Sequence, residues 1–177
     1  MIRLESPNTK YKESYINGVN EIKEKGIDNE SNEHYLKQSV DELENNFEDF
    51  VKDQLETHKG VKEGKLVPQT LFWMIDENNE YCGKISLRHY LNENLKKFGG
   101  HIGYDVIPSK RGNGYATKAL ALCLKEAKKH KLEKVLLTCD DDNIASIKSI
   151  ERNGGVLQDK IQYKAEVLTR RYWIDLK

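Results

Sequence analysis

Residues 111–116 read Arg-Gly-Asn-Gly-Tyr-Ala and lie between an apolar, strand-like segment (102–107) and a segment with a helical pattern (115–130). A glycine-rich turn that opens a helix presents several unpaired backbone N–H groups at the positive end of the helix dipole. Gly112 and Gly114 allow the backbone to approach an anion closely and to adopt a positive φ. Three cations lie nearby in the sequence: Lys110, Arg111 and Lys118. The turn therefore predicts a phosphate-binding site.

Two common phosphate-binding loops match this turn poorly. The pattern GxxxxGK[ST] of P-loop nucleotide-binding proteins is absent, because no Gly-Lys-Ser or Gly-Lys-Thr occurs here. The dinucleotide pattern GxGxxG is half present, since Thr117 stands where the third glycine belongs. Glu133 lies near the offset of the acidic residue in that pattern, but it precedes the next strand instead of ending it. A nucleotide-binding domain remains an alternative reading of the turn.

A second motif follows an apolar, partly β-branched run, residues 135–139, which predicts a buried strand. Asn143 is placed to cap the short helix that follows, and Gly154 is placed to end it. The acidic residues 140–142 lack the spacing and the glycine of a calcium-binding loop. We therefore expect cap and loop chemistry in this segment, and no metal site.

Together, these two motifs resemble those of the GCN5-related N-acetyltransferases (GNAT family). Arg111, Gly114 and Ala116 match the Arg-x-x-Gly-x-Ala pattern of motif A, and Asn143-x-x-Ser146 with its flanking strand and helix resembles motif B. The pattern is closest to the branch of ribosomal-protein N-terminal acetyltransferases. The resemblance implies an acetyl-CoA-dependent enzyme that transfers an acetyl group to a primary amine by direct attack in a ternary complex.

The resemblance also implies where the cosubstrate acetyl-CoA binds. In the family, the glycine turn cradles the pyrophosphate, motif B contacts the CoA arm, and the strand before the turn pairs with pantetheine through its backbone. An N–H group at Val106 would polarise the thioester carbonyl. Carried over to this sequence, the cofactor-binding residues are Val106, Ile107, Arg111, Gly112, Asn113, Gly114, Tyr115, Ala116, Asn143 and Ser146.

Catalysis requires a base for the amine and a route for the thiolate to leave. His101, on the strand before the turn, is the first candidate for the base because an unperturbed histidine has a pKa near 6.5, and His89 is the second. Many relatives carry a tyrosine as proton donor where this sequence has Ile150, which cannot donate. Either the thiolate leaves unprotonated or another tyrosine substitutes, the candidates being Tyr104, Tyr163 and Tyr172.

The sequence leaves the acceptor open: a small-molecule amine or an amine of a protein or peptide. The helical segment 8–57 is expected to cover the acceptor side, where its acids either attract a cationic amine or form a solvated face. These acids are Asp28, Glu30, Glu33, Asp41, Glu42 and Glu44. The absent tyrosine keeps a second function open, a CoA-binding module without catalysis. A homodimer is a further expectation drawn from the family.

The pattern of elements predicts a mixed α/β fold in a single domain, residues 1–177. The resemblance specifies a mostly antiparallel sheet with a splayed parallel strand pair and helices on both faces. We expect strands at 2–4, 70–75, 81–90, 100–107 and 135–139, two closing strands after 155, and helices at 8–25, from 39 to about 57, at 115–130 and before 153.

Composition narrows the classes of partner. The chain of 177 residues has 29 basic and 29 acidic side chains, so nothing in its charge favours nucleic acid or an anionic membrane. It shows no apolar run of signal-peptide or membrane-spanning length. The three isolated cysteines, Cys82, Cys123 and Cys139, are expected in the core, which indicates the reducing cytoplasm.

Overall fold

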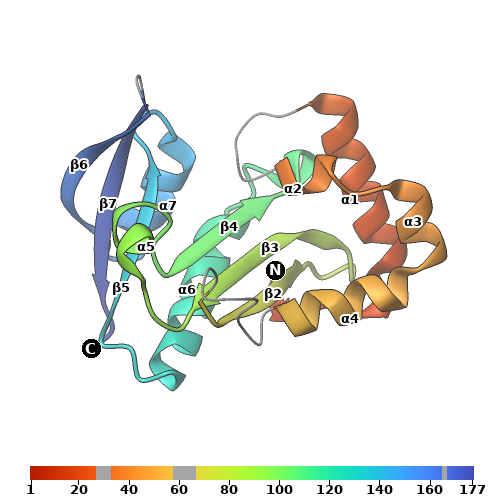
Figure 1. The fold of residues 1–177 in the computed structure, drawn as a ribbon, viewed down its shortest axis with the longest axis horizontal. Helices are drawn as coiled ribbons and strands as arrows, with labels where there is room; N and C mark the ends of the chain where they lie inside the picture. Colours follow the sequence, from red (N-terminus) through yellow and green to blue (C-terminus); the bar gives the residue numbers. More distant parts are fainter. Residues whose placement is uncertain (27–32, 58–66, 165–166) are drawn as a thin grey trace.

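The computed structural model describes residues 1–26, 33–57, 67–164 and 167–177. Its strands form two sheets, one with the order β1-β2-β3-β4 and one with the order β5-β7-β6, which lie side by side in Figure 1. All strand pairs within each sheet are antiparallel. The strands are β1 (Arg3–Glu5), β2 (Gln69–Ile75), β3 (Tyr81–Arg88), β4 (Ile102–Val106), β5 (Lys134–Asp140), β6 (Val156–Lys164) and β7 (Val167–Asp175).

Helices cover both faces of the first sheet. Side chains that alternate along β2, β3 and β4 pack on one face against α6 (Tyr115–Lys129). The opposite face of β2 packs against the N-terminal helices (Figure 1). These are α1 (Lys12–Lys25), α2 (Glu33–Leu36), α3 (Val40–Asn45) and α4 (Phe47–Thr57). The expected mixed α/β class is therefore confirmed.

An aromatic core holds the N-terminal helices on the sheet. Tyr15 of α1 stacks on Trp73 of β2 with ring centroids 4.9 Å apart, and it also contacts Phe47 of α4 at 5.7 Å. The helix expected from residue 39 to about 57 is two helices, because the chain breaks at Asn46, whose φ of −130° is not helical. The break turns the apolar residues of both pieces onto the same core.

The connection expected between residues 91 and 100 contains a short helix, α5 (Glu93–Lys97). Asn92 caps it by accepting a hydrogen bond from the Leu95 N–H at 2.9 Å. Gly99 and Gly100, both with positive φ, then return the chain to β4. The helix and this turn form one wall of the site described below.

A joint between His101, just before β4, and Leu136 of β5 connects the two sheets. There the His101 N–H donates to the Leu136 C=O at 2.7 Å, and the Leu136 N–H donates to Nδ1 of His101 at 2.9 Å. Beyond the joint the two strands run in the same general direction and diverge (Figure 1). The helix α6 connects them, and α7 (Ile144–Arg152) follows β5. This arrangement is the splayed strand pair expected from the sequence.

The burial of the cysteines and the length of the helices bear on two expectations drawn from composition. All three cysteines are buried, as expected for core residues. Among the helices that the structure describes, none has the length and apolar character needed to cross a membrane.

Candidate functional site

The glycine turn begins α6 with a cluster of unpaired N–H groups. Gly112 and Gly114 have φ values of 79° and 71°, and a Cβ at either position would meet nothing within 4 Å. The first N–H bonded to a backbone carbonyl is that of Lys118, which donates to Gly114 at 3.1 Å. Among the described residues, the preceding N–H groups from 112 to 117 have no backbone acceptor. Gly112 and residues 114–117 line the cavity described next, and unpaired N–H groups there suit an anion.

A cavity of about 310 Å³ lies between this turn and α7. Lys148 and Arg152, one helical turn apart on α7, face the turn across it and add positive charge. Sequence reasoning missed both, although their i, i+4 spacing behind Asn143 was a usable signal. Lys110 lines the cavity too, but its ammonium group pairs with Asp76 at 3.1 Å and with Glu80.

Polar contacts join the two predicted motifs into one unit. The Asn143 side chain accepts a hydrogen bond from the Ser146 N–H at 3.0 Å, as expected of a helix cap. The Thr117 hydroxyl of α6 donates to Ser149 of α7 at 3.0 Å. The Asn153 amide donates to the Thr117 C=O, also at 3.0 Å. The start of α6 and the second motif are thereby fixed against each other.

The hydrogen bonds of β4 decide which backbone groups face the gap between the sheets. The Arg88 N–H donates to the His101 C=O at 2.7 Å, and the Ile107 N–H donates to the Cys82 C=O at 2.9 Å. Because bonding alternates along an antiparallel pair, the odd-numbered residues of β4 bond to β3. The backbone groups of Tyr104 and Val106 therefore face the gap.

This geometry corrects the expectation for Ile107. Its N–H is bonded to Cys82, and its C=O accepts the Lys110 N–H at 2.9 Å, so neither group can pair with a ligand in the gap. The expected role of Val106 fits the geometry through its N–H, since its C=O accepts from Nε of Arg111 at 3.0 Å. Tyr104 takes the place that the sequence assigned to Ile107.

The facing edge belongs to β5. The Asp141 N–H donates to the Leu168 C=O of β7 at 2.8 Å, so by the same alternation Thr138 and Asp140 turn their backbone groups toward the gap. A second cavity, of about 510 Å³, lies here. It shares Tyr104, Asn143 and Ser146 with the cavity at the glycine turn, so the two are ends of one channel.

His101 lies at the joint, where its surroundings differ from those of a general base. The side chain is 7% exposed, and Nδ1 already accepts the Leu136 N–H. Burial, with the nearby positive charge of Arg88, lowers the pKa of His101 to about 4. The imidazole is therefore neutral at pH 7, with its proton on Nε2. It lines a separate cavity of about 380 Å³ on the other side of the joint.

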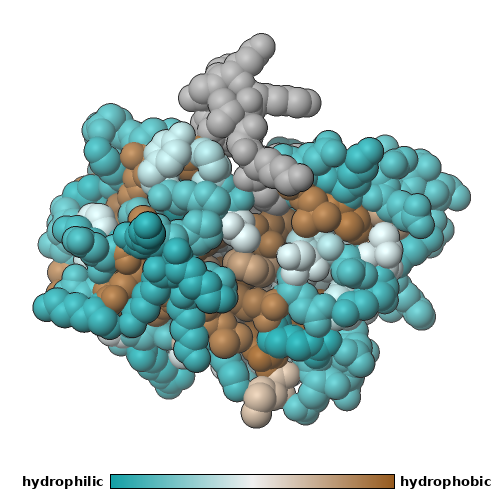
Figure 2. Space-filling model, turned by 90° about the horizontal axis from the view of Figure 1, so that it is seen from below, coloured by the Kyte–Doolittle hydropathy of each residue, from teal (hydrophilic) through white to brown (hydrophobic). Residues whose placement is uncertain are grey.

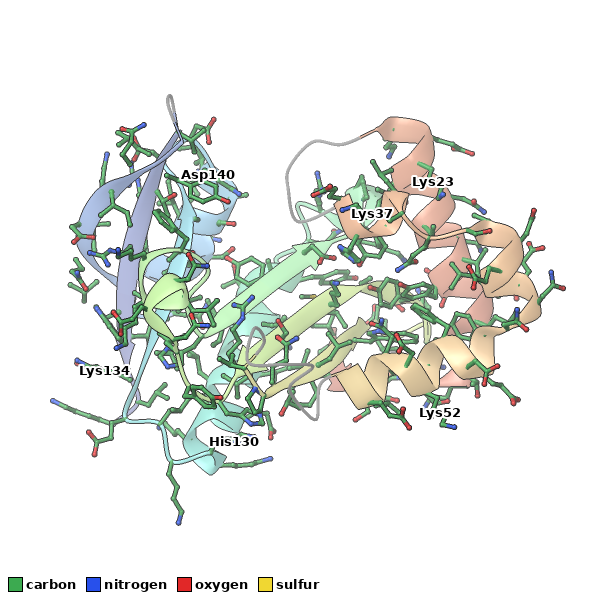
Figure 3. All side chains as sticks on the ribbon, in the orientation of Figure 1. Lys23, Lys37, Lys52, His130, Lys134 and Asp140 are labelled. Atoms are coloured by element: carbon green, nitrogen blue, oxygen red, sulfur yellow. The ribbon has the colours of Figure 1, made fainter. Side chains whose placement is uncertain are left out.

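His89 lines that same separate cavity and is not brought near the glycine turn. Its Nε2 is 2.8 Å from the Thr70 hydroxyl, and its ring stacks on His130 with centroids 4.1 Å apart. Figure 3 shows His130 at the lower edge of the molecule and Asp140 above it, beside α7. Figure 2, viewed from the His130 end, shows apolar surface in the middle of this face. Burial and the neighbouring His130 lower the pKa of His89.

Tyr104 is the candidate proton donor that borders both ends of the channel. Its hydroxyl oxygen is buried without a hydrogen-bond partner among the described residues. Burial raises the pKa of Tyr104 to about 12, while Ser146 and Ser149 of α7 oppose that rise. Ile150 lies in the core at 1% exposure, and the Tyr172 hydroxyl donates to Glu151 at 3.2 Å. Tyr163 lines one of the two cavities, whereas Tyr104 lines both.

Sequence reasoning missed a buried carboxyl group on the other face of β4. Oδ1 of Asp105 accepts the Tyr35 hydroxyl at 2.6 Å, and Tyr35 in turn lies 2.6 Å from the Tyr81 hydroxyl. Burial raises the pKa of Asp105 to about 6, although Lys84, opposite it on β3, opposes the rise. An acid inside an otherwise apolar strand, 102–107, was the available signal.

The acids of the N-terminal helices do not meet at this channel. The exposed side chains of Glu33, Asp41, Glu42 and Glu44 line neither of its two cavities. Asp28 and Glu30 lie outside the described residues. Among the described residues, no group of three or more His, Cys, Asp or Glu side chains is arranged to hold a metal ion.

A sheet that opens between two strands, with an anion-binding turn at its mouth, defines a protein that takes an extended, phosphate-bearing ligand as an additional strand. A family model described as "Acetyltransferase (GNAT) domain" matches residues 27–156. The chain belongs to this family, which confirms the resemblance and the predicted class of acetyl-CoA-dependent N-acetyltransferases.

Solved structures share the fold at low sequence identity. The microcin C7 self-immunity acetyltransferase MccE, in complex with acetyl-CoA and AMP, is 17% identical, with a TM-score of 0.65 over 98% of this chain and 92% of that one. RimL, a ribosomal L7/L12 α-N-protein acetyltransferase in complex with coenzyme A, is 15% identical, with a TM-score of 0.66 over 98% and 93%. A chimera of spermidine N-acetyltransferase SpeG from Vibrio cholerae and hSSAT is 16% identical, with a TM-score of 0.63 over 99% and 95%. No curated protein matches the sequence.

Proposed function

We propose that residues 1–177 form a single acetyltransferase domain that binds acetyl-CoA in this channel and acetylates a primary amine. The amine belongs either to a small molecule or to a protein or peptide. The observation that carries the proposal is the continuity of the channel. Unpaired N–H groups at the glycine turn lead directly to the open backbone edges of Tyr104 and Val106. Anion-binding groups followed by an unpaired strand edge suit pyrophosphate and the pantetheine amides.

The chemistry follows from the two faces of β4. Asp105 lies on the face toward α1–α4, whereas Tyr104 lies on the face toward α6 and α7. The acceptor ammonium gives a proton to Asp105, and its nitrogen attacks the thioester carbonyl carbon. The C–S bond then breaks, and the CoA thiolate leaves on the side of Tyr104, whose hydroxyl donates a proton to it. The second proton of the attacking nitrogen then restores the Tyr104 hydroxyl as the amide forms. The Val106 N–H stabilises the oxyanion.

Asp105 suits the part of the base better than His101 does. A pKa near 6 leaves it ionised at neutral pH and still basic enough to take a proton. His101 and His89 were the bases expected from sequence. In this proposal, His101 holds the joint between the sheets and thereby positions β4 against β5.

The alternative function is a module that binds CoA but does not catalyse acetyl transfer. Ile150, at the position of the relatives' tyrosine, favours it, because a core side chain there can donate nothing. The proposed compartment is the cytoplasm, and its support is the three buried cysteines, none of which is in a disulfide.

Isothermal titration with acetyl-CoA, with ATP and NAD as controls, tests the cosubstrate. We expect micromolar binding of acetyl-CoA and no response to ATP or NAD. Gly114→Asp should remove most of this affinity, because its carboxylate would occupy the place of the pyrophosphate. Gly154→Asp is the control, since Gly154 also has a positive φ, of 85°, also meets nothing within 4 Å, and lines neither cavity.

The results of these titrations distinguish an acetyltransferase from a nucleotide-binding domain and from a non-catalytic CoA-binding module. Unchanged affinity in Gly114→Asp would reject the assigned site, and tighter binding of ATP or NAD would favour a nucleotide-binding domain. Binding of acetyl-CoA without acetylation of any amine in a broad panel would favour the non-catalytic module.

A further inference from the structure

Arg88, at the end of β3, is a largely buried cation, and only one nitrogen of its guanidinium group is hydrogen-bonded to the protein among the described residues. Its Nη1 donates to the Gly99 C=O at 3.1 Å and to the Gly100 C=O at 2.9 Å. Its remaining N–H donors, on Nε and Nη2, have no protein partner among the described residues. This edge of the guanidinium is one that binds a carboxylate or phosphate in bidentate fashion.

The Nε–Nη2 edge is not sealed inside the core. None of the Arg88 nitrogens is among the side-chain atoms of the described residues that are fully enclosed without a hydrogen-bond partner. Arg88 lines the cavity of about 510 Å³ together with Gly103, Tyr104 and Asn143. The donors therefore open into the channel in which the acetyl group must lie.

No carboxylate within the described residues neutralises Arg88. None forms an ion pair with it, and burial lowers its pKa with no acid opposing that shift. Asp140 is the one acid that lines the same cavity, and it lies at the exposed end of β5. Lys84, on the same face of β3, faces Asp105 instead. A buried cation without an internal counter-ion favours an anionic ligand.

Alternation along the strands places Arg88 on the acceptor side. Lys84, Ser86 and Arg88 follow one another on one face of β3, and Gly103 and Asp105 lie beside them on β4. Gly103 has no side chain, and a Cβ there would first meet Ser86 at 3.9 Å. An acceptor whose amine reaches Asp105 therefore passes over Gly103 and extends toward Arg88.

We propose that the acceptor is an amine that also carries an oxyanion, a carboxylate or a phosphate, which the Nε–Nη2 edge of Arg88 binds. This inference rests on the proposed acetyltransferase function. It differs from the alternative in which acids on the N-terminal helices attract a cationic amine.

The direct test follows the Nε–H signal of Arg88 by ¹⁵N NMR in the protein saturated with CoA. The signal is assigned by its loss in Arg88→Gln. Sodium acetate and inorganic phosphate are the two probes, with chloride at equal ionic strength as the control. We expect a saturable shift with acetate, with phosphate, or with both, and the stronger probe identifies the anion. A signal unmoved by either probe overturns the inference.

A kinetic test uses matched acceptors: amino acids against their carboxamides, and phosphoethanolamine against ethanolamine. We expect kcat/KM to favour the anionic member by about 10- to 100-fold, and Arg88→Gln to remove that preference. Lys96→Gln, which removes an exposed cation on α5, should leave the preference intact. An equal rate for both members, with acetyl-CoA binding intact, would overturn this inference alone. Absence of acetyl-CoA binding would instead reject the proposed function.

Discussion

At the scale of single residues, Gly103 and Asp105 define the acceptor side of β4. Gly103 leaves space, and Asp105 supplies a carboxyl group whose Oδ1 accepts the Tyr35 hydroxyl. Both positions belong to the face opposite to Tyr104. Substitutions here should therefore change acceptor chemistry and leave the binding of acetyl-CoA largely intact.

Gly103→Val should raise the KM for the acceptor at least tenfold, because the added methyl groups would occupy the acceptor's path. The fold should tolerate the change, since the nearest atom to a new Cβ is 3.9 Å away and the position needs no positive φ. Steady-state kinetics with any accepted amine, together with the Kd for acetyl-CoA, measure the two effects. A loss of acetyl-CoA affinity equal to the loss in kcat/KM would contradict the placement.

Asp105→Asn should lower kcat by about 10²- to 10⁴-fold, the usual contribution of a positioned base. Because burial raises the pKa of Asp105 to about 6, the wild-type rate should rise with pH through that value as the carboxyl group ionises. The variant should lose this limb of the profile. Asparagine can still accept the Tyr35 hydroxyl, so a pH-rate profile with the limb retained would exclude Asp105 as the base.

At the scale of elements, the joint between β4 and β5 determines the shape of the channel. The Leu136 N–H donates to the His101 side chain. At the point where the strands separate, a side-chain nitrogen therefore replaces a backbone carbonyl as the acceptor between β4 and β5. Gly100 packs beside it, with the place of a Cβ only 2.4 Å from the Leu136 carbonyl oxygen. The joint must therefore be stable for the gap to keep its width.

Acid should weaken this joint. Burial lowers the pKa of His101 to about 4, below its ordinary value of 6.5. Its stabilisation is therefore complete above pH 6.5 and is lost as the pH falls toward 4, by up to about 1.4 kcal/mol per pH unit. His101→Ala should cost about 1–3 kcal/mol at pH 7, because the Leu136 N–H loses its acceptor. The variant should also lose this dependence on pH.

Urea denaturation at pH 7, 6 and 5 measures both effects. His130→Ala is the control, since His130 is exposed at the end of α6. If the wild type and His101→Ala lost stability in parallel between pH 7 and 5, the group responsible would lie elsewhere.

At the scale of the whole molecule, a ligand in the gap would complete one continuous sheet from two. The gap-facing backbone groups belong to Tyr104 and Val106 on one side and to Thr138 and Asp140 on the other. The α6–α7 contacts hold the mouth of the gap. Binding there should stabilise both sheets together.

Amide hydrogen exchange should report this completion directly. The Val106 N–H should exchange faster than the Ile107 N–H in the ligand-free protein, because only Ile107 is bonded to β3. Saturating acetyl-CoA should slow exchange at Val106 and leave Ile107 nearly unchanged. NMR-detected exchange resolves the two adjacent amides. Equal protection of both amides before and after binding would contradict the proposed ligand path.

The sequence predicted the features that depend on neighbours along the chain. The glycine turn, the Asn143 cap and the β2–β3 hairpin all follow from local spacing. It named Ile107 beside Val106, whereas the gap-facing pair is Tyr104 and Val106, because which of two adjacent N–H groups faces the gap depends on the partner strand. An acid inside an apolar strand was a local signal for Asp105, but its burial and its hydrogen bond to Tyr35, 70 positions away, could not be read from local spacing.

The glycines suggest how the demands of folding and of function divide in this chain. A Cβ at Gly83 would lie 2.2 Å from the Asp105 carbonyl oxygen, and one at Gly100 would lie 2.4 Å from that of Leu136. Gly112 and Gly114 face open space instead. In a library selected only for soluble expression, positions 83 and 100 should remain glycine, whereas positions 112 and 114 should also admit Asn and Asp, which tolerate a positive φ. Selection for acetylation should fix all four, so comparing the two selections would separate structural from functional constraint.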